Sequence, residues 1–331
     1  MQTPLLSVRD LEIVFQIAGS EVPVVRELSF DIAYGETLGI VGESGCGKSI
    51  TALAIMGLVP NPPGRISKGS IHFEGVDITK VTEKKLQSLR GNDISMVFQE
   101  PMTSLNPVFT VGEQIAETAR THYGINRTEA RDRAIEILRL VGIPSPEKRV
   151  DDYPHQLSGG MRQRVMIAIS LVCEPKLLIA DEPTTALDVT VQAQIFDLLR
   201  ELQSKTNTAI ILITHDIGVV AEMADNVMVM YAGRNIESGR SIDFIRNPQH
   251  PYTKGLISCI PTLEVDPPDT PEPLFEIPGV VPSAKELAKP GCAFAPRCPK
   301  VMPHCQTKFP SRFQISDDQS VSCWLSQEEI V

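Results

Sequence analysis

The sequence predicts an α/β fold with a mostly parallel central sheet, on three observations. A glycine-rich octapeptide at residues 42–49 lies between an apolar run at 37–41 and a helix-compatible run at 49–58. Strand-like and helix-like segments then alternate through about residue 240, which is the pattern of a parallel sheet covered by helices. Finally, 42% hydrophobic and 22% charged residues in a chain of 331 are ordinary for a protein that buries a core.

The predicted elements follow from the spacing of apolar residues. Turn signals at Gly19, Pro23 and Gly35 divide the first predicted strands, which lead into the octapeptide. Helical spacing between the first and last thirds of the chain indicates an inserted helical region, at about residues 100–175. Strands are predicted within 5–41 and at 71–73, 94–98, 177–180 and 209–214, and helices at 110–143, 157–173 and 191–203.

The octapeptide Gly-Glu-Ser-Gly-Cys-Gly-Lys-Ser fits the phosphate-binding loop pattern. Its glycines let the backbone curl so that successive N–H groups face one anion. Lys48 can reach the β- and γ-phosphates of a nucleotide, and the Ser49 hydroxyl can bind Mg²⁺. The phosphates would lie at a helix N-terminus, where the helix dipole favours negative charge. The expected nucleotide-binding residues are Gly42, Ser44, Gly45, Cys46, Gly47, Lys48, Ser49 and Ile50.

Two acids end the predicted strand at 177–180. Asp181 can hold Mg²⁺ beside Ser49, and Glu182 would face the γ-phosphate and polarise the attacking water. An acidic turn after a core strand is a common structural arrangement. The phosphate-binding loop in the same chain favours the catalytic interpretation.

Leu157-Ser158-Gly159-Gly160-Met161 opens a predicted helix with a second anion-binding terminus, which lacks a lysine. The segment resembles the Leu-Ser-Gly-Gly-Gln signature of the ATP-binding-cassette (ABC) family, with Met161 in place of the glutamine. That difference leaves the phosphate-facing Ser158, Gly159 and Gly160 intact.

The other family elements occur in order. Gln99 resembles the Q-loop glutamine, Asp188 belongs to a Thr-Ala-Leu-Asp segment similar to the D-loop, and His215 resembles the switch histidine that contacts the γ-phosphate. Phe15 matches, by position only, the ring that stacks on adenine, and a core phenylalanine is the alternative. The resemblance spans roughly residues 5–240.

The resemblance implies a P-loop ATPase domain with a mostly parallel core, an antiparallel strand subdomain and a helical insertion. Two chains would hold two ATP molecules between them, each gripped by Lys48 of one chain and Ser158 of the other. Catalysis would depend on Glu182, His215 and Gln99. The implied Mg²⁺ ligands are Ser49, Gln99 and Asp181.

Further segments point to one branch of this family. The segments at 101–107, 247–253 and 277–283 resemble ATPase subunits of dipeptide and oligopeptide importers. The implied partners are a second ABC ATPase in a heterodimer, two membrane permease subunits and, indirectly, a solute-binding protein. The chain would lie peripherally on the cytoplasmic face of the cell inner membrane. Nickel or antimicrobial peptides remain alternative substrates, and a soluble ABC factor in nucleic-acid or iron–sulfur biology is an alternative function.

Four cysteines, Cys292, Cys298, Cys305 and Cys323, lie close together near the C-terminus with gaps of 5, 6 and 17 residues. Four thiolates suit tetrahedral Zn²⁺ or an iron–sulfur cluster, but the spacing matches neither common zinc pairs nor ferredoxins. The family resemblance favours a 4Fe–4S cluster. Zn²⁺, disulfides and free thiols remain alternatives.

The net charge of −10 argues against nucleic acid as a partner, because duplex binding requires a basic face. No basic start precedes an apolar stretch, and no apolar run reaches 18 residues, so we expect neither a signal peptide nor a membrane span. The expected division is an ATP-binding domain at 1–240, a proline-rich connector at 241–283 and a cysteine-rich region at 284–331.

Overall fold

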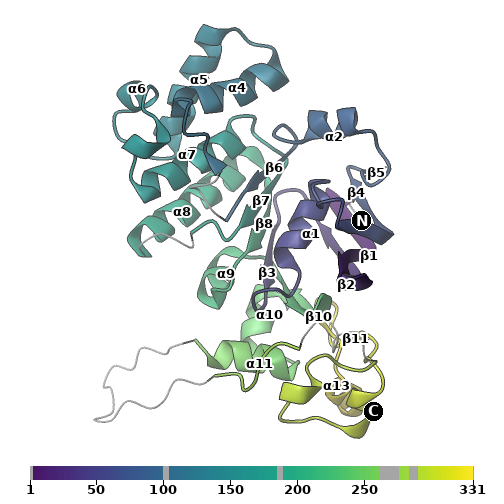
Figure 1. Cartoon of the computed structure of the whole chain (residues 1–331). Coiled ribbons are helices and arrows are strands. Elements are labelled where there is room, and N and C mark those ends of the chain that lie inside the picture. The colour runs from purple at the N-terminus through teal and green to yellow at the C-terminus, as the bar shows by residue number, and fades with distance from the viewer. Residues whose placement is uncertain (1–2, 100–103, 185–188, 261–275, 283–289, 331) are drawn as a thin grey trace, which may run out of the picture.

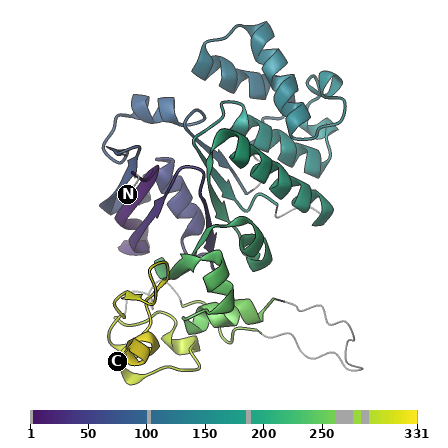
Figure 2. The ribbon, with the colours of Figure 1, turned by 180° about the vertical axis from the view of Figure 1, so that it is seen from behind.

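A computed structural model of the chain describes residues 3–99, 104–184, 189–260, 276–282 and 290–330 (Figure 1). The described residues form two β-sheets, with helices packed against them and a helical region projecting at one end (Figures 1 and 2). Within those ranges, no helix is both long enough and apolar enough to cross a membrane.

The larger sheet has the strand order β11-β12-β10-β9-β3-β8-β7-β6 within the described residues. Its strands from β9 to β6 run parallel, whereas β10, β12 and β11 add to it antiparallel. Strands β3, β6, β7 and β8 are buried at every position, as expected for parallel strands covered on both faces. The strands are β3 (Thr37–Val41), β6 (Ile94–Val97), β7 (Leu177–Asp181), β8 (Ala209–Ile213), β9 (Asn226–Tyr231), β10 (Arg234–Arg240), β11 (Phe313–Gln314) and β12 (Ser320–Val321).

The smaller sheet is antiparallel, in the order β2-β1-β4-β5. The predicted turn at Pro23 is wrong, because Pro23 lies inside β2 and pairs with Val14 of β1. Since β2 is an edge strand, a residue without an N–H is tolerated there. The strands are β1 (Leu6–Ile17), β2 (Ser20–Ile32), β4 (Gly64–Phe73) and β5 (Val76–Asp77).

Helices cover both faces of the larger sheet. One hydrophobic cluster joins α1 (Lys48–Ile55) to the smaller sheet and to one set of side chains from β3, β7 and β8. Another joins α7 (Gly159–Leu171) and α8 (Val189–Thr206) to the alternate residues of β7 and β8. A third surrounds α9 (Ile217–Met223). The parallel strands are therefore packed between helices on both faces, which fixes the positions of the loops that follow β3, β7 and β8.

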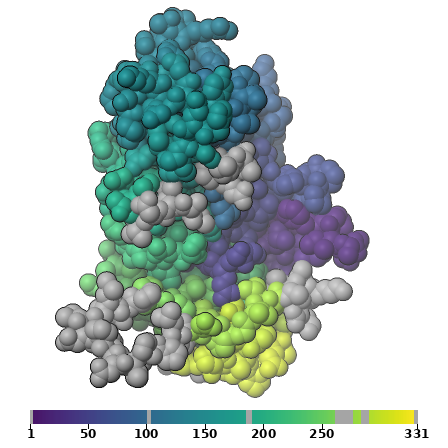
Figure 3. All heavy atoms as spheres, turned by 60° about the vertical axis from the view of Figure 1, so that its left-hand side comes forward, coloured from purple at the N-terminus to yellow at the C-terminus, as the bar shows by residue number. Residues whose placement is uncertain are grey.

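The helical region lies at one end of the molecule (Figures 1 and 3). The predicted helical stretch at 110–143 is two helices, α4 (Val111–Tyr123) and α5 (Arg127–Leu140). Gly124 ends α4 in the left-handed conformation, and the Asn126 side chain caps α5. The short helices α2 (Glu83–Leu89) and α6 (Pro146–Arg149) complete the regular helices before α7 in the described chain.

The residues after β10 lie at the end of the molecule opposite to the helical region (Figures 1 and 2). The first part of the expected connector is helical, with α10 (Ser241–Arg246) and α11 (Pro251–Ser258), whereas its residues 261–275 lie outside the described part. Buried Glu237 of β10 accepts hydrogen bonds from the Gln249 and His250 amides, both 2.8 Å long. The cysteine-rich region contains the turns η2 (Ala295–Arg297) and η3 (Pro303–Gln306) and the helix α13 (Leu325–Ile330).

Candidate functional site

The glycine-rich loop connects β3 to α1 at the carboxyl edge of the parallel strands. Gly42 has a φ of 152°, and a Cβ there would stand 2.2 Å from the carbonyl oxygen of Met230. Gly47 forms the N-cap of α1 at a φ of 105°, in the left-handed region that favours glycine. The glycines at these two positions are therefore required by the path of the loop.

Lys48 is buried at the base of the loop. Its Nζ donates hydrogen bonds of 2.6 Å to the Gly42 carbonyl and 3.0 Å to the Glu43 carbonyl. The ammonium group is therefore held beneath the loop by loop carbonyls, in a position from which it can serve a phosphate bound above.

Asp181 ends β7 and lies beside Ser49. The Ser49 hydroxyl donates a hydrogen bond of 3.1 Å to Asp181 Oδ1. Burial raises the pKa of Asp181 and the neighbouring Glu182 charge adds to this, while the Ser49 hydrogen bond and Lys48 oppose it. A hydroxyl beside a carboxylate is a donor set that Mg²⁺ uses together with phosphate oxygens, so these residues fit that ion.

Glu182 lies at the meeting point of three strand ends. It adopts a φ of 47°, which is uncommon for a non-glycine residue. Gln99, after β6, donates a 2.9 Å hydrogen bond to Glu182 Oε2. His215, after β8, has its Nδ1 3.7 Å from Glu182 Oε1. The structure thus brings together the three residues expected to act in catalysis.

A pocket of 320 Å³ opens over this site. Phe15 of β1 lies at its wall, together with the exposed side of the glycine-rich loop and the two polar residues Gln99 and Glu182. Gly42 and Cys46 belong to the loop but do not line the pocket, and Cys46 is buried beneath it. The lining residues are Phe15, Ile17, Val24, Ser44, Gly45, Gly47, Lys48, Ser49, Ile50, Gln99 and Glu182.

Ser158, Gly159 and Gly160 do not line this pocket. Ser158 is the N-cap of α7, where its Oγ accepts a 3.3 Å hydrogen bond from the Met161 amide. Ser158 and Gly159 are exposed, and a Cβ added at Gly159 would meet no atom within 4 Å. The N-terminus of α7 is therefore accessible to a ligand or a partner. Asp188 lies outside the described residues.

Cys292, Cys298, Cys305 and Cys323 line one small pocket of 20 Å³. Burial raises the pKa values of Cys292 and Cys323 to about 11, and nearby thiolates add to the rise. The donors suit a soft metal, but the space is about that of one water molecule. Within the described residues, no three His, Cys, Asp or Glu side chains are arranged to hold one metal ion. The predicted ligands are thus neighbours without ligating geometry in this conformation.

Two residues far along the chain also reach the glycine-rich loop, although the sequence alone does not place them there. The Tyr252 hydroxyl accepts a 2.9 Å hydrogen bond from the Glu43 amide, and Arg297 forms an ion pair with the Glu43 carboxylate. Tyr252 lies in the importer-like segment 247–253, but neither residue belongs to a nucleotide-binding motif, so the sequence did not place them at this loop.

Comparison with known proteins agrees with this geometry. The ABC transporter family profile matches residues 25–185, and the profile of the oligopeptide/dipeptide transporter C-terminal region matches residues 236–305. The dipeptide transport ATP-binding protein DppD of Bacillus subtilis (strain 168) is 49% identical over 330 residues, covering 98% of this chain and 95% of DppD. The oligopeptide transport ATP-binding protein AppD of the same organism is 52% identical over 327 residues, covering 98% of each chain.

A solved structure shares the fold. It is the dimeric, post-hydrolysis state of the ATP-binding cassette MJ0796 bound to ADP and phosphate. The match has a TM-score of 0.65 at 26% identity, and covers 71% of this chain and 98% of that one.

Proposed function

This chain belongs to the ABC transporter family, in the branch of dipeptide and oligopeptide transport ATP-binding proteins, and on that basis we propose that it powers a membrane importer of short peptides. The observation that carries the proposal is the convergence of Lys48, Asp181 and Glu182 at one sheet edge, in a chain alike over its whole length to those relatives. The reaction is ATP hydrolysis.

Each residue contributes a separate part of the chemistry. Lys48 and the loop amides bind the β- and γ-phosphates, which orients the γ-phosphate toward Glu182. Ser49 and Asp181 would hold Mg²⁺, which neutralises charge that develops on the phosphate oxygens. Glu182 orients the attacking water and accepts its proton, and His215 supplies a donor to the γ-phosphate. Gln99 links this site to the helical region.

The ATP site is completed by a second chain, whose Ser158, Gly159 and Gly160 cover the γ-phosphate. The exposed N-terminus of α7 supports this, because three backbone amides at a helix start bind an anion. Ser158→Arg should leave ATP binding by the single chain unchanged but prevent ATP-dependent pairing of the ATPase subunits. Asp132→Arg, on the exposed face of α5, is the matched control. Pairing by Ser158→Arg at the normal ATP concentration would exclude this composite site.

The partners are a related ATPase subunit, forming a heterodimer, and two permease subunits at the cytoplasmic face of the inner membrane. The exposed hydrophobic residues Val108 and Phe109, at the start of the helical region, support a protein contact there. Purification from detergent-solubilised membranes should recover permease subunits with this chain. Recovery of a particle free of membrane proteins would favour a soluble factor instead.

The peptide assignment is tested separately from the ATPase. In proteoliposomes that contain the assembled importer and its binding protein, dipeptides and oligopeptides should stimulate ATP hydrolysis and be taken up. Stimulation by Ni²⁺ or by antimicrobial peptides alone would reassign the cargo while leaving the motor role in place.

The cysteine-rich region after residue 283 would form a unit with a metal group, beyond the ATP-binding domain and connector. Cys292, Cys298, Cys305 and Cys323 are proposed as sulfur ligands of a 4Fe–4S cluster, with Zn²⁺ as the alternative. Their common pocket supports the proposal, although the thiols would have to move apart around a cluster. Metal analysis and visible absorbance of anaerobically purified protein separate iron–sulfur from zinc. Absence of both metals would exclude the proposal.

A further inference from the structure

Arg297 connects the cysteine-rich region directly to the glycine-rich loop. Its Nη1 lies 2.7 Å from Glu43 Oε2 and its Nη2 lies 3.0 Å from Glu43 Oε1, so the ion pair is bidentate. Glu43 is the second residue of the loop octapeptide. A bidentate pair between a guanidinium and a carboxylate fixes orientation as well as charge.

The remaining donors of Arg297 are also occupied. Nε donates to the Pro278 carbonyl at 2.9 Å, Nη2 to the Ile277 carbonyl at 3.3 Å, and Nη1 to the Tyr231 hydroxyl at 3.3 Å. Together with Glu43, these acceptors use all five N–H groups of a guanidinium. The side chain is 6% exposed. Arg297 is therefore a fixed anchor and not a surface residue that meets Glu43 by chance.

Glu43 is held at each of its polar groups. Its amide donates to the Tyr252 hydroxyl, its carboxylate pairs with Arg297, and its carbonyl accepts from Lys48 Nζ. Lys48 is the residue that serves the phosphates. Glu43 therefore contacts both Arg297 and the Lys48 ammonium group, and it links the two through its carboxylate and its carbonyl.

We propose that Arg297 is a positioning residue of the ATP site, which neutralises Glu43 and fixes the glycine-rich loop in its phosphate-receiving conformation. The η2 turn places Arg297 between Cys292 and Cys298, so ATP binding depends on the fold of the cysteine-rich turn. This inference rests on the ATP site described above and on no other part of the proposed function.

The physical effect of losing Arg297 follows from charge. Without the guanidinium, the Glu43 carboxylate remains 25% exposed beside a loop that must bind a polyanion. An unpaired, partly buried carboxylate repels phosphate and is free to rotate, which also loosens the carbonyl that orients Lys48. Neutralising Glu43 in the same chain removes the repulsion, and recovery of ATP affinity would distinguish this charge effect from a general loss of folding.

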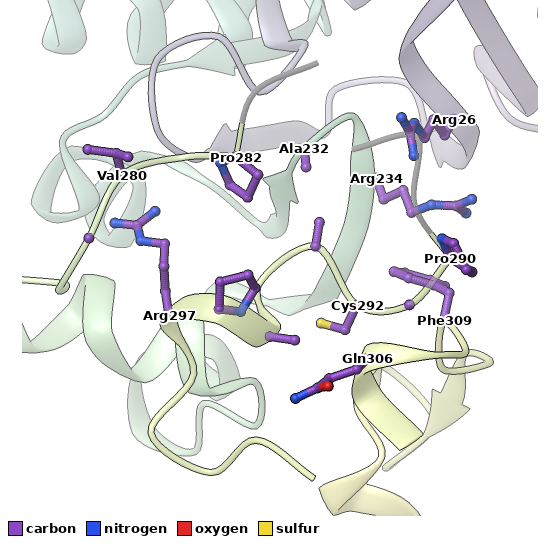
Figure 4. Close-up of a pocket in the computed structure, with 15 residues that line it drawn as sticks. Arg26, Ala232, Arg234, Val280, Pro282, Pro290, Cys292, Arg297, Gln306 and Phe309 are labelled. Carbon is purple, nitrogen blue, oxygen red and sulfur yellow. The ribbon is translucent and has the colours of Figure 1, made fainter. Parts of the chain in front are cut away.

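Arg234 provides a matched control. Figure 4 shows Arg297 on one side of a 590 Å³ pocket, with Arg234 and Arg26 on the other. Arg234 forms an ion pair with Glu27 and its guanidinium carbon stands 4.3 Å from the ring centre of Phe309. It therefore joins the ATP-binding part to the cysteine-rich region, as Arg297 does, but its side chain has no described contact with the glycine-rich loop.

The test measures Mg·ATP binding to the full chain by calorimetry, for Arg297→Met, Arg297→Met with Glu43→Gln, and Arg234→Met. Arg297→Met should weaken ATP binding by about tenfold, which is the range for unpairing a charge beside a site. Adding Glu43→Gln should return the affinity to within about threefold of the unchanged chain, and Arg234→Met should also stay within about threefold. The deficit of Arg297→Met should shrink at high salt, because added ions screen the repulsion.

Several outcomes overturn the proposal. They are normal ATP affinity in folded Arg297→Met, an equal loss in Arg234→Met, or a double variant as weak as Arg297→Met alone. If Arg297→Met does not fold, Arg297→Lys is measured, because lysine keeps the charge but not the bidentate geometry. Its affinity should fall by about threefold, and unchanged affinity overturns the proposal. Absence of ATP binding by the unchanged chain would overturn the ATP site itself.

Discussion

Gln99 donates a 2.9 Å hydrogen bond to the carboxylate of Glu182, although the two residues follow different strands. Gln99 follows β6 on the side of the chain that leads to the helical region, and Glu182 directly follows β7. The bond holds one carboxylate oxygen of Glu182, the residue proposed to orient the attacking water. A movement of the helical region that displaces Gln99 would therefore remove this bond and change the orientation of Glu182, which would couple contact with a permease to the rate of hydrolysis.

Truncation of Gln99 should reduce ATPase activity less than replacement of its side chain by a carboxylate. Gln99→Ala should keep ATP affinity within about threefold and lower ATPase activity of the assembled importer by about tenfold, since one positioning bond is lost. Gln99→Glu should be worse by about a further tenfold, because two carboxylates would face each other. ATPase assays in proteoliposomes check the order. Equal activity of the two variants would show that the Gln99 amide does not orient Glu182.

Glu182→Gln should bind ATP and fail to hydrolyse it. The amide keeps the size of the side chain but cannot accept a proton from water, so turnover should fall by roughly 100-fold or more. The closed dimer should accumulate with ATP bound, which size-exclusion chromatography measures. Glu174→Gln, at an exposed ion pair with Arg133, is the control and should hydrolyse normally. Normal turnover of Glu182→Gln in the complex would remove Glu182 from the mechanism.

Lys48→Met should abolish tight ATP binding while leaving the loop folded. The thioether side chain fills the buried volume, but it provides no charge for the phosphates, and the affinity should fall by about tenfold or more. Mg·ATP titration of the purified chain is the measurement. The loss should be smaller for adenosine, which carries no phosphate. A comparable loss for adenosine would mean that the variant has disturbed the pocket as a whole.

His250 should make the folded state sensitive to acid. Burial lowers its pKa from 6.5 to about 3, so the folded state stays neutral where the unfolded chain binds a proton. The free energy of unfolding therefore decreases as the pH falls below the pKa of His250 in the unfolded chain, by about 2 kcal/mol at roughly pH 5. His250→Asn keeps an acceptor for the Tyr252 amide at the start of α11 but does not titrate.

The measurement is urea unfolding of both proteins at about pH 7 and pH 5, followed by circular dichroism. The difference between the two proteins isolates His250 from nearby Glu237, whose own pKa is raised by burial and is common to both. His250→Asn should lose about 2 kcal/mol less than the unchanged chain over this interval. Equal losses would mean that His250 does not contribute.

The sequence is informative wherever one short segment carries both the chemistry and the fold. Residues 42–49 specify a loop, its helix and its ligand together, because glycines at positive φ followed by a lysine at the start of a helix are typical of a phosphate-binding loop. The apolar runs at 177–180 and 209–214 likewise place Glu182 and His215 at strand ends, and parallel strands end at one edge. The structure brings these residues together, as the order of strands requires.

The sequence is less informative where contacts join distant segments. Pro23 has the residue type of a turn, and only the edge position of β2 explains why it lies in a strand. Arg297 pairs with Glu43 across most of the chain, and nothing local distinguishes it from other arginines. The four cysteines cluster in the sequence and in space, yet their spacing does not fix which metal they would hold.

Strand β12 pairs with β10 on one side and with β11 on the other, so the C-terminal residues extend the larger sheet. Without them, Glu237 and Ser238 of β10 would lose their antiparallel partners, and an open sheet edge is a surface onto which another copy can add and start an aggregate. A shortened chain that stops after β10 would therefore be prone to precipitate, whatever happens at the cysteines. We therefore expect the tail to limit association between copies as well as to complete the sheet.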